Sequence, residues 1–119
     1  MFTEILRNLT AETPGAIGAV LMGYDGIAIC SHFIPGDDLD VQMIAIEYAN
    51  VLKEIRNAAA VLAIGDMEEV NIHTRRYRFV IRAVTDEYFV VLALVRDGNF
   101  GKGRYVLRRD IERLLEALQ

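Results

Sequence analysis

The two histidines and the single serine are the side chains best suited to nucleophilic or general-base chemistry. They are His32, His73 and Ser31. A hydrolase site needs a serine and a histidine within hydrogen-bond reach, with a carboxylate to orient the histidine. Ser31 and His32 are adjacent in a segment of strand type, so their side chains point to opposite faces. No pattern places His73 near Ser31, and we therefore expect no catalytic residue and no enzyme.

The glycine-rich run at residues 98–103 resembles a phosphate-binding loop only superficially. A P-loop has four residues between its first glycine and the Gly-Lys pair, followed by Ser or Thr. Here two residues intervene, and Gly103 follows Lys102. We interpret the run as a flexible connection between a strand and a helix, and we expect no bound cofactor.

Three aspartates, Asp37, Asp38 and Asp40, could suggest a calcium loop. A helical pattern follows them at once, however, and no glutamate closes a twelve-residue pattern. Acidic residues suit the positive end of a helix dipole. They therefore indicate a helix start, and we expect no metal site.

The only cysteine, Cys30, follows the apolar residues 27–29. A single cysteine cannot form a disulfide or a zinc site within one chain. We expect it to be a small residue of the core.

Basic residues form two clusters with two possible meanings. We favour solvated faces that balance the acidic residues; the alternative is contact with an acidic partner, or an arginine supplied to a GTPase site. The clusters are Arg75, Arg76, Arg78 and Arg82, then Lys102, Arg104, Arg108, Arg109 and Arg113.

The composition is that of a single domain spanning residues 1–119. Hydrophobic residues make up 53% of the chain, enough for a core without disulfides. The net charge of −4 opposes nucleic-acid binding. The longest apolar run, residues 89–95, is far shorter than a membrane span, and no signal peptide is recognisable. We expect a cytoplasmic protein.

Apolar periodicity and turn signals predict an α/β (α+β) fold with the order α-β-β-α-β-β-β-α. Its sheet has five mainly antiparallel strands, with a long helix on one face and two helices on the other. Strand 88–95 is apolar throughout, so it should lie in the middle, beside the first strand, while strand 67–75 should be an edge. The predicted helices are 3–12, 38–64 and 102–118, and the predicted strands are 16–22, 27–31, 67–75, 76–84 and 88–95.

The helix at 38–64 is the most informative element. It would span about 40 Å, whereas a strand of seven residues covers only about 23 Å. One side carries an apolar stripe that should pack on the sheet: Val41, Ile44, Ala45, Tyr48, Leu52, Ile55, Ala59 and Leu62. The outer side should be charged if it faced water, but it is largely apolar or uncharged: Met43, Ile46, Asn50, Asn57, Val61 and Ile64, with Glu47, Lys53 and Glu54 at its margins.

This outer side predicts contact with the same helix of a second copy across a two-fold axis. An edge strand at 67–75 would also be protected by pairing with its symmetry mate. The alternative is that the outer apolar residues are scattered surface hydrophobes, which are common. The predicted dimer interface comprises Met43, Ile46, Asn50, Lys53, Asn57, Val61, Val70, Asn71, Ile72 and His73.

Several segments together resemble the roadblock/dynein light chain family, in its bacterial MglB-like branch. They are the Gly15-Ala16-Ile17-Gly18-Ala19-Val20-Leu21 strand, the Tyr24-Asp25-Gly26 hairpin into Ile27-Ala28-Ile29, the long second helix, and the entry from Gly101 to Leu107 into the last helix.

This resemblance implies a homodimer with paired long helices and joined sheets, serving as a platform for a Ras-like small GTPase. MglB-like members act as GTPase-activating proteins for MglA-like polarity GTPases, and other members are scaffolds or motor-associated subunits. Because the family uses no single fixed arginine finger, the resemblance assigns no catalytic residue here.

The sequence thus predicts a non-enzymatic, homodimeric regulatory or scaffold protein that binds and modulates a Ras-like small GTPase. The alternative is a small-molecule sensor of PAS-like or profilin-like architecture. Sensor pockets are apolar with a few converging polar groups, and only Tyr48 and Asn50 are candidates for inward polar groups.

Overall fold

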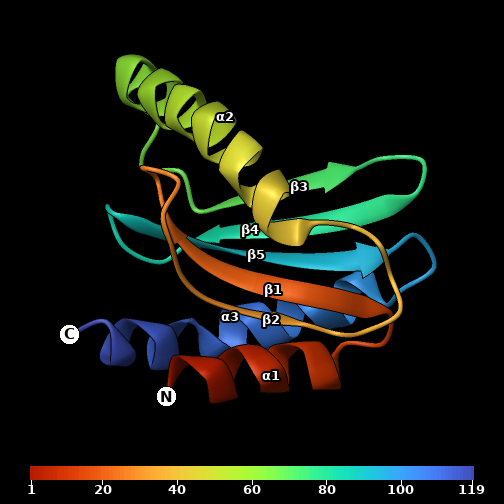
Figure 1. Ribbon diagram of the computed structural model, residues 1–119. Helices are drawn as coiled ribbons and strands as arrows, with labels where there is room; N and C mark the ends of the chain where they lie inside the picture. The colour runs from red at the N-terminus through yellow and green to blue at the C-terminus, as the bar shows by residue number, and fades with distance from the viewer.

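Five antiparallel strands form one sheet in the computed structural model, which describes all residues 1–119 (Figure 1). The strand order is β2-β1-β5-β4-β3. The predicted element order and fold class are confirmed. The elements are α1 (Phe2–Glu12), β1 (Ala16–Gly23), β2 (Ala28–Phe33), α2 (Val41–Leu62), β3 (Glu69–His73), β4 (Tyr77–Ala83), β5 (Tyr88–Val95) and α3 (Phe100–Ala117).

The central strand is β5, between β1 and β4, as its uninterrupted apolar sequence predicts. Val91 of β5 is opposite Val20 of β1 and Ile81 of β4. Both faces of this strand are buried, which excludes polar side chains from it. The predicted position of β3 at an edge is also confirmed.

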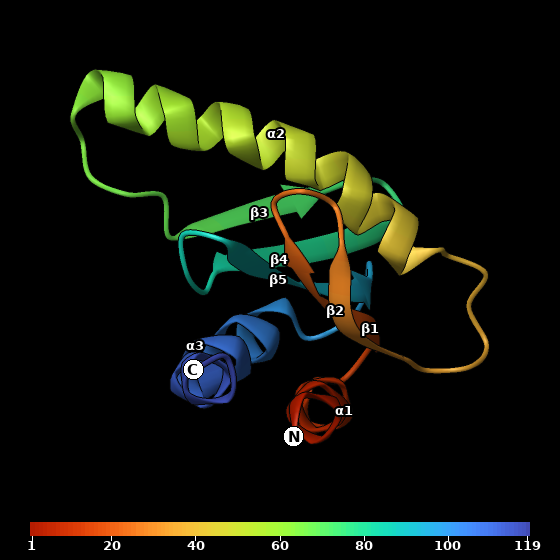
Figure 2. The same cartoon turned by 60° about the vertical axis from the view of Figure 1, so that its left-hand side comes forward.

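Helix α2 covers one face of the sheet, and α1 and α3 cover the other, so the molecule has three layers (Figures 1 and 2). Alternate residues of each inner strand therefore enter different cores. In β1, Ala19 and Leu21 pack with α1 and α3, whereas Val20 and Met22 pack with α2. This alternation fixes which side of each strand can contribute to a surface.

The start of α2 is set by aspartates, as predicted, but three residues later than the pattern suggested. Asp40 is the N-cap, and its carboxylate accepts a hydrogen bond from the Met43 amide at 3.0 Å. Asp37 instead accepts from the Leu39 amide at 2.8 Å and from the Tyr77 hydroxyl at 3.0 Å. These bonds hold the preceding loop outside the helix. The helix has 22 residues and is about 33 Å long.

Helix α2 ends at a left-handed C-cap residue, Ala63, with φ of 53°. Gly65, with φ of 97°, completes the exit. The helical conformation ends at Leu62, shortly before the stop that was predicted at Gly65.

The predicted flexible connection at 98–103 is wrong, because most of this run is the first turn of α3. Asn99 caps the helix, its side chain accepting from the Lys102 amide at 3.0 Å. Gly103 is buried, and a Cβ built on it would lie 3.2 Å from side-chain carbons of Leu92 and Thr13. The glycine is needed for close packing of α3 on the sheet rather than for flexibility.

Strand β3 is shorter than the predicted 67–75 because a turn follows His73. The Thr74 hydroxyl accepts from the Tyr77 amide at 3.0 Å, and the Thr74 amide donates to the Tyr77 carbonyl at 2.9 Å. These bonds close the β3–β4 hairpin and end the strand at His73.

Candidate interaction surface

The inner side of α2 packs on the sheet largely as the predicted stripe requires. Val41, Ala45 and Leu52 are fully buried. Ala49, outside the predicted stripe, is buried as well, because it lies between these residues on the helix. Leu62 was assigned to the inner stripe, but this assignment is wrong, since its side chain is 65% exposed.

The exposure of Leu62 arises because the C-terminal turns of α2 extend past the sheet (Figures 1 and 2). Val61 and Ile64, which were predicted to face outward, are 77% and 73% exposed. An exposed apolar helix end is typical of a contact site.

Further along the outer side of α2, Met43 and Ile46 are also exposed. The uncharged side chains of Asn50 and Asn57 lie between them and Val61, and they are exposed too. These residues therefore face away from the sheet, as predicted. Asn50 points to solvent, so it does not serve as the inward polar group that a sensor would use.

A second apolar row on α2 was missed by the sequence interpretation. It runs along the side nearest β3 at helical spacing: Val51, Ile55, Ala58 and Leu62. Val51 is exposed, while Ile55 is partly buried. The spacing was visible in the sequence, but Ile55 and Leu62 were assigned to the sheet-facing stripe.

A groove of about 310 Å³ lies between this row and the chain leading into β3. Ile55, Ala58 and Leu62 line it on the helix side, and Met67 and Val70 on the other. The groove therefore joins the apolar side of α2 to the free edge of the sheet.

The free edge itself belongs to β3, which pairs only with β4. The four predicted interface residues of this strand divide between its two faces. Val70 and Ile72 pack beneath α2. Asn71 and His73 are exposed and lie on the opposite face of the sheet, the one that α3 covers, where the His73 ring meets Phe100 edge-on at 4.6 Å. The four side chains therefore do not form one surface, and only their backbone lies along the same free edge.

Glu69 anchors the start of β3. Its carboxylate accepts from the Asn71 amide group at 3.0 Å, from Arg82 at 3.3 Å, and from Arg104 Nε at 2.8 Å. Burial alone would raise the pKa of Glu69, but the hydrogen bonds from Asn71 and Arg104 and the charges of both arginines lower it. These contacts hold the edge strand to β4 and α3.

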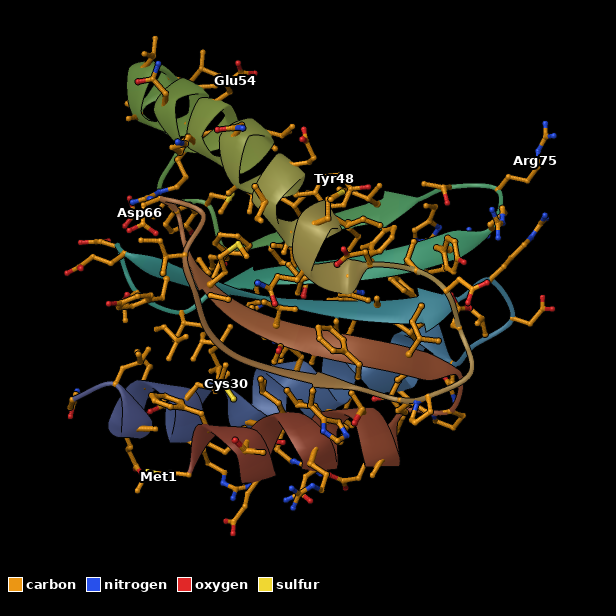
Figure 3. All side chains as sticks on the ribbon, viewed as in Figure 1. Met1, Cys30, Tyr48, Glu54, Asp66 and Arg75 are labelled. Atoms are coloured by element: carbon orange, nitrogen blue, oxygen red, sulfur yellow. The ribbon has the colours of Figure 1, made fainter.

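Three members of the basic clusters balance carboxylates of the same chain. Arg82 and Arg104 pair with Glu69, and Arg109 pairs with Glu12 and Asp110. For these three the favoured interpretation of the clusters is confirmed. By contrast, Arg75 projects from the β3–β4 turn away from the body of the molecule (Figure 3).

The residues considered for catalysis do not form a site. Ser31 and His32 lie on β2 and His73 on β3, at opposite edges of the sheet. No group of three or more His, Cys, Asp or Glu side chains is arranged to hold a metal ion.

Two further predictions concern single residues. Cys30 is only partly buried, with its sulfur 3.4 Å from the Thr3 hydroxyl, because β2 is an edge strand (Figure 3). Cys30 therefore packs against the core, as expected, but at its margin rather than inside it. Tyr48 is partly buried and meets Phe79 edge-on at 5.5 Å, and burial raises its pKa.

None of the three helices has both the length and the apolar content required to cross a membrane.

Comparison with known proteins gives both the fold and the family. No protein-family model and no curated protein matches the chain. Among solved structures, MglC from Myxococcus xanthus is 38% identical, with 96% of each chain covered and a TM-score of 0.70.

More distant structures share the fold. A Roadblock/LC7 domain from Streptomyces avermitilis is 16% identical, with 97% of this chain and 95% of that chain covered and a TM-score of 0.83. The gliding protein MglB from Thermus thermophilus is 19% identical, with 95% and 84% covered and a TM-score of 0.84. Together with the identity to MglC, these likenesses show that the chain belongs to the roadblock/LC7 family, as a relative of MglC.

Proposed function

We propose that this protein is a non-enzymatic homodimer whose paired α2 helices form a platform for a Ras-like small GTPase. The observation that carries the proposal is the exposed apolar side of α2 beside the unpaired edge of β3. The GTPase as partner rests on the resemblance to MglB-like proteins.

Self-association would cover both unprotected features at once. Pairing α2 with its symmetry mate removes Val61 and Ile64 from water, a favourable change proportional to the apolar area buried. Pairing β3 with its mate satisfies the free backbone groups of the edge and joins two sheets into one. The proposed interface comprises Met43, Ile46, Asn50, Lys53, Asn57, Val61, Val70, Asn71, Ile72 and His73.

We add two exposed residues, Val51 and Leu62, to this proposed interface. Leu62 lines the groove toward β3, and helical spacing places Val51 on the same side of α2. A partner that covers both the outer side of α2 and the β3 edge must pass over this side. We therefore include them in the contact surface.

Light scattering over a range of concentrations tests the dimer. The wild-type chain should have twice the mass of 13.4 kDa, and Ile46→Glu or Val61→Glu should shift it to the monomer mass, because each places a charge in an apolar contact. Both positions are exposed in the single chain, so the variants should fold. Asn8→Glu is the matched control, because Asn8 is exposed on α1, on the face of the sheet opposite α2. It should leave the dimer intact. A wild-type monomer at all concentrations would contradict the proposal.

Binding to a GTPase is tested separately. A Ras-like GTPase encoded beside this gene, loaded with GTP or with GDP, should be retained by the wild-type protein in one nucleotide state more than in the other. The rate of GTP hydrolysis, measured with and without the protein, then shows whether the platform stimulates catalysis. A dimer that retains the GTPase in neither state would leave the self-association standing and remove the GTPase.

A further inference from the structure

A pocket of about 340 Å³ opens at one end of the sheet, on the face covered by α2. The β1–β2 hairpin, the β4–β5 turn and the connection from α2 to β3 converge at this end (Figure 1). Its volume is within the range of small-molecule sites. Of its ten lining residues, only Lys53 and Asn57 belong to the proposed dimer interface.

Tyr24, in the β1–β2 hairpin, is one of the residues that line this pocket, and its hydroxyl group is buried and unsatisfied. The side chain is only 7% exposed and packs on Phe89, with ring centroids 5.0 Å apart. Its hydroxyl is the one buried side-chain polar atom in the structure without a hydrogen-bond partner. A buried donor without an acceptor destabilises a fold, so this hydroxyl requires a partner that the chain itself does not supply.

Charges of opposite sign line the two walls of the pocket. Lys53 and Arg56 project from α2, and the Arg56 guanidinium lies over the Tyr24 ring, with Cζ 4.1 Å from the centroid. Asp66 and Asp86 line the opposite wall, from the α2–β3 connection and the β4–β5 turn. Figure 3 shows Asp66 below α2, near the hairpin tip.

These opposite charges form no ion pair with one another. The four ion-pair contacts of the chain involve Arg82, Arg104 and Arg109, and none involves a charged residue of this pocket. Burial raises the pKa of Tyr24, while the charge of Arg56 lowers it and that of Asp86 raises it, so both walls act on the hydroxyl.

The lining selects a ligand by charge. Two cations would repel a metal ion, and two carboxylates would repel a phosphate or a simple anion. A small molecule that carries one charge of each sign interacts favourably with both walls. Met67, Ala83 and the Tyr24 ring add an apolar surface for a side chain.

We propose that this pocket binds a free α-amino acid, with its carboxylate on Lys53 and Arg56, its ammonium group on Asp66 and Asp86, and the Tyr24 hydroxyl as a further hydrogen-bond partner. Charge-assisted hydrogen bonds of this kind are stronger than neutral ones and fix orientation. The protein then carries a metabolite-sensing site in addition to its interaction surface.

The site is independent of the GTPase proposal and of most of the dimer contact. Lys53, Arg56 and Ala60 face the hairpin, whereas Ile55, Ala58 and Leu62 line the groove toward β3, on the other side of the same helix. Lys53 and Asn57 belong to both the pocket and the margin of the proposed dimer interface. Repeating the binding experiment on the Val61→Glu variant therefore separates the two, since a site that belongs to one chain binds equally well in a monomer.

Calorimetric titration of the full chain with the common L-α-amino acids tests the proposal. Acetate and methylamine are the matched probes, because each carries only one of the two charges. At least one amino acid should bind and raise the midpoint of thermal unfolding, and neither probe should do so at the same concentration. Arg56→Gln and Asp86→Asn should each weaken binding about tenfold, as expected for the loss of one charged contact. Arg113→Gln, exposed on α3, should leave it unchanged.

Tyr24→Phe gives a readout that a purely structural role would not produce. Because the hydroxyl has no partner in the unliganded chain, its removal should leave the unfolding midpoint unchanged or raise it, while amino-acid binding weakens severalfold. Absence of binding for every amino acid up to about 10 mM, in the millimolar range of very weak complexes, would overturn the proposal. Equal binding of acetate or methylamine, or unchanged affinity in Arg56→Gln, would overturn it too.

Discussion

Arg109 of α3 and Glu12 of α1 form a bidentate ion pair, with Nη2 2.6 Å from Oε2 and Nη1 3.2 Å from Oε1. The same guanidinium donates from Nε to Asp110 at 3.0 Å, and the Asp110 side chain is almost fully buried. One exposed cation thus joins the two helices and also compensates a buried carboxylate. Its hydrogen bond lowers the pKa of Glu12.

This arrangement predicts that substitutions of Arg109 and of Glu12 lower the stability of the fold by different amounts. Arg109→Gln leaves Asp110 without its donor, and an unsatisfied buried acceptor costs about 1–3 kcal/mol. Glu12→Gln removes only an exposed partner, so its effect on the free energy of unfolding should be smaller. Urea denaturation of both variants measures the difference. Equal losses would show that Arg109 does not support Asp110.

Acid should weaken the edge strand through Glu69. The hydrogen bonds and charges of its partners lower its pKa in the folded chain, despite burial. A carboxylate with a lowered folded pKa contributes stability above its unfolded value of about 4.3, and loses it as pH falls through the folded pKa. The stability difference between the wild type and Glu69→Gln should therefore be full at pH 7 and shrink below about pH 4. Thermal unfolding over this range measures it, and a constant difference would contradict the assignment.

The close approach of Gly15 and Gly98 predicts a strong effect of a single methyl group. Gly15 has φ of 84°, and a Cβ on it would lie 2.4 Å from the Gly98 Cα. Gly36, with φ of 116° and open space around it, is the matched control. Gly36→Ala should cost only backbone strain of about 1–3 kcal/mol, whereas Gly15→Ala should cost clearly more, because backbone must also move. Denaturant midpoints compare the two.

Most of the fold was predictable because its signals are local. The unbroken apolar run of β5 requires a covered central strand, and the half-polar β3 requires an edge. Asp25 and Gly26 predict the β1–β2 hairpin, where the Asp25 carboxylate accepts from the Ile27 amide at 3.0 Å and Gly26 has φ of 87°. Such signals depend on residues that are neighbours in the sequence, so one amino-acid sequence is sufficient to recognise them.

The remaining features depend on residues far apart in the chain. Glu69 and Arg104 are separated by 35 positions, and Arg109 and Glu12 by 97. Likewise, the pocket forms only when the hairpin, α2 and the β4–β5 turn meet at one end of the sheet, so no local pattern could have singled out Tyr24. The exposure of Leu62 also depended on tertiary structure, because the helical spacing cannot show where the sheet beneath α2 ends.

The three aspartates before α2 should differ in their effect on stability, although the sequence pattern predicted the same role for all three. Only Asp40 caps the helix, with its carboxylate accepting from the Met43 amide. Asp40→Ala should cost about 1 kcal/mol of unfolding free energy, the usual value for a lost N-cap. Asp38 is exposed and its side chain makes no hydrogen bond within the chain, so Asp38→Ala, which removes the same charge, should stay within about 0.5 kcal/mol of the wild type. If the two variants were equally destabilised, the loss would come from the charge near the helix dipole rather than from the cap. Urea denaturation at low and at high salt distinguishes these causes, because salt screens the dipole interaction and leaves the capping hydrogen bond in place.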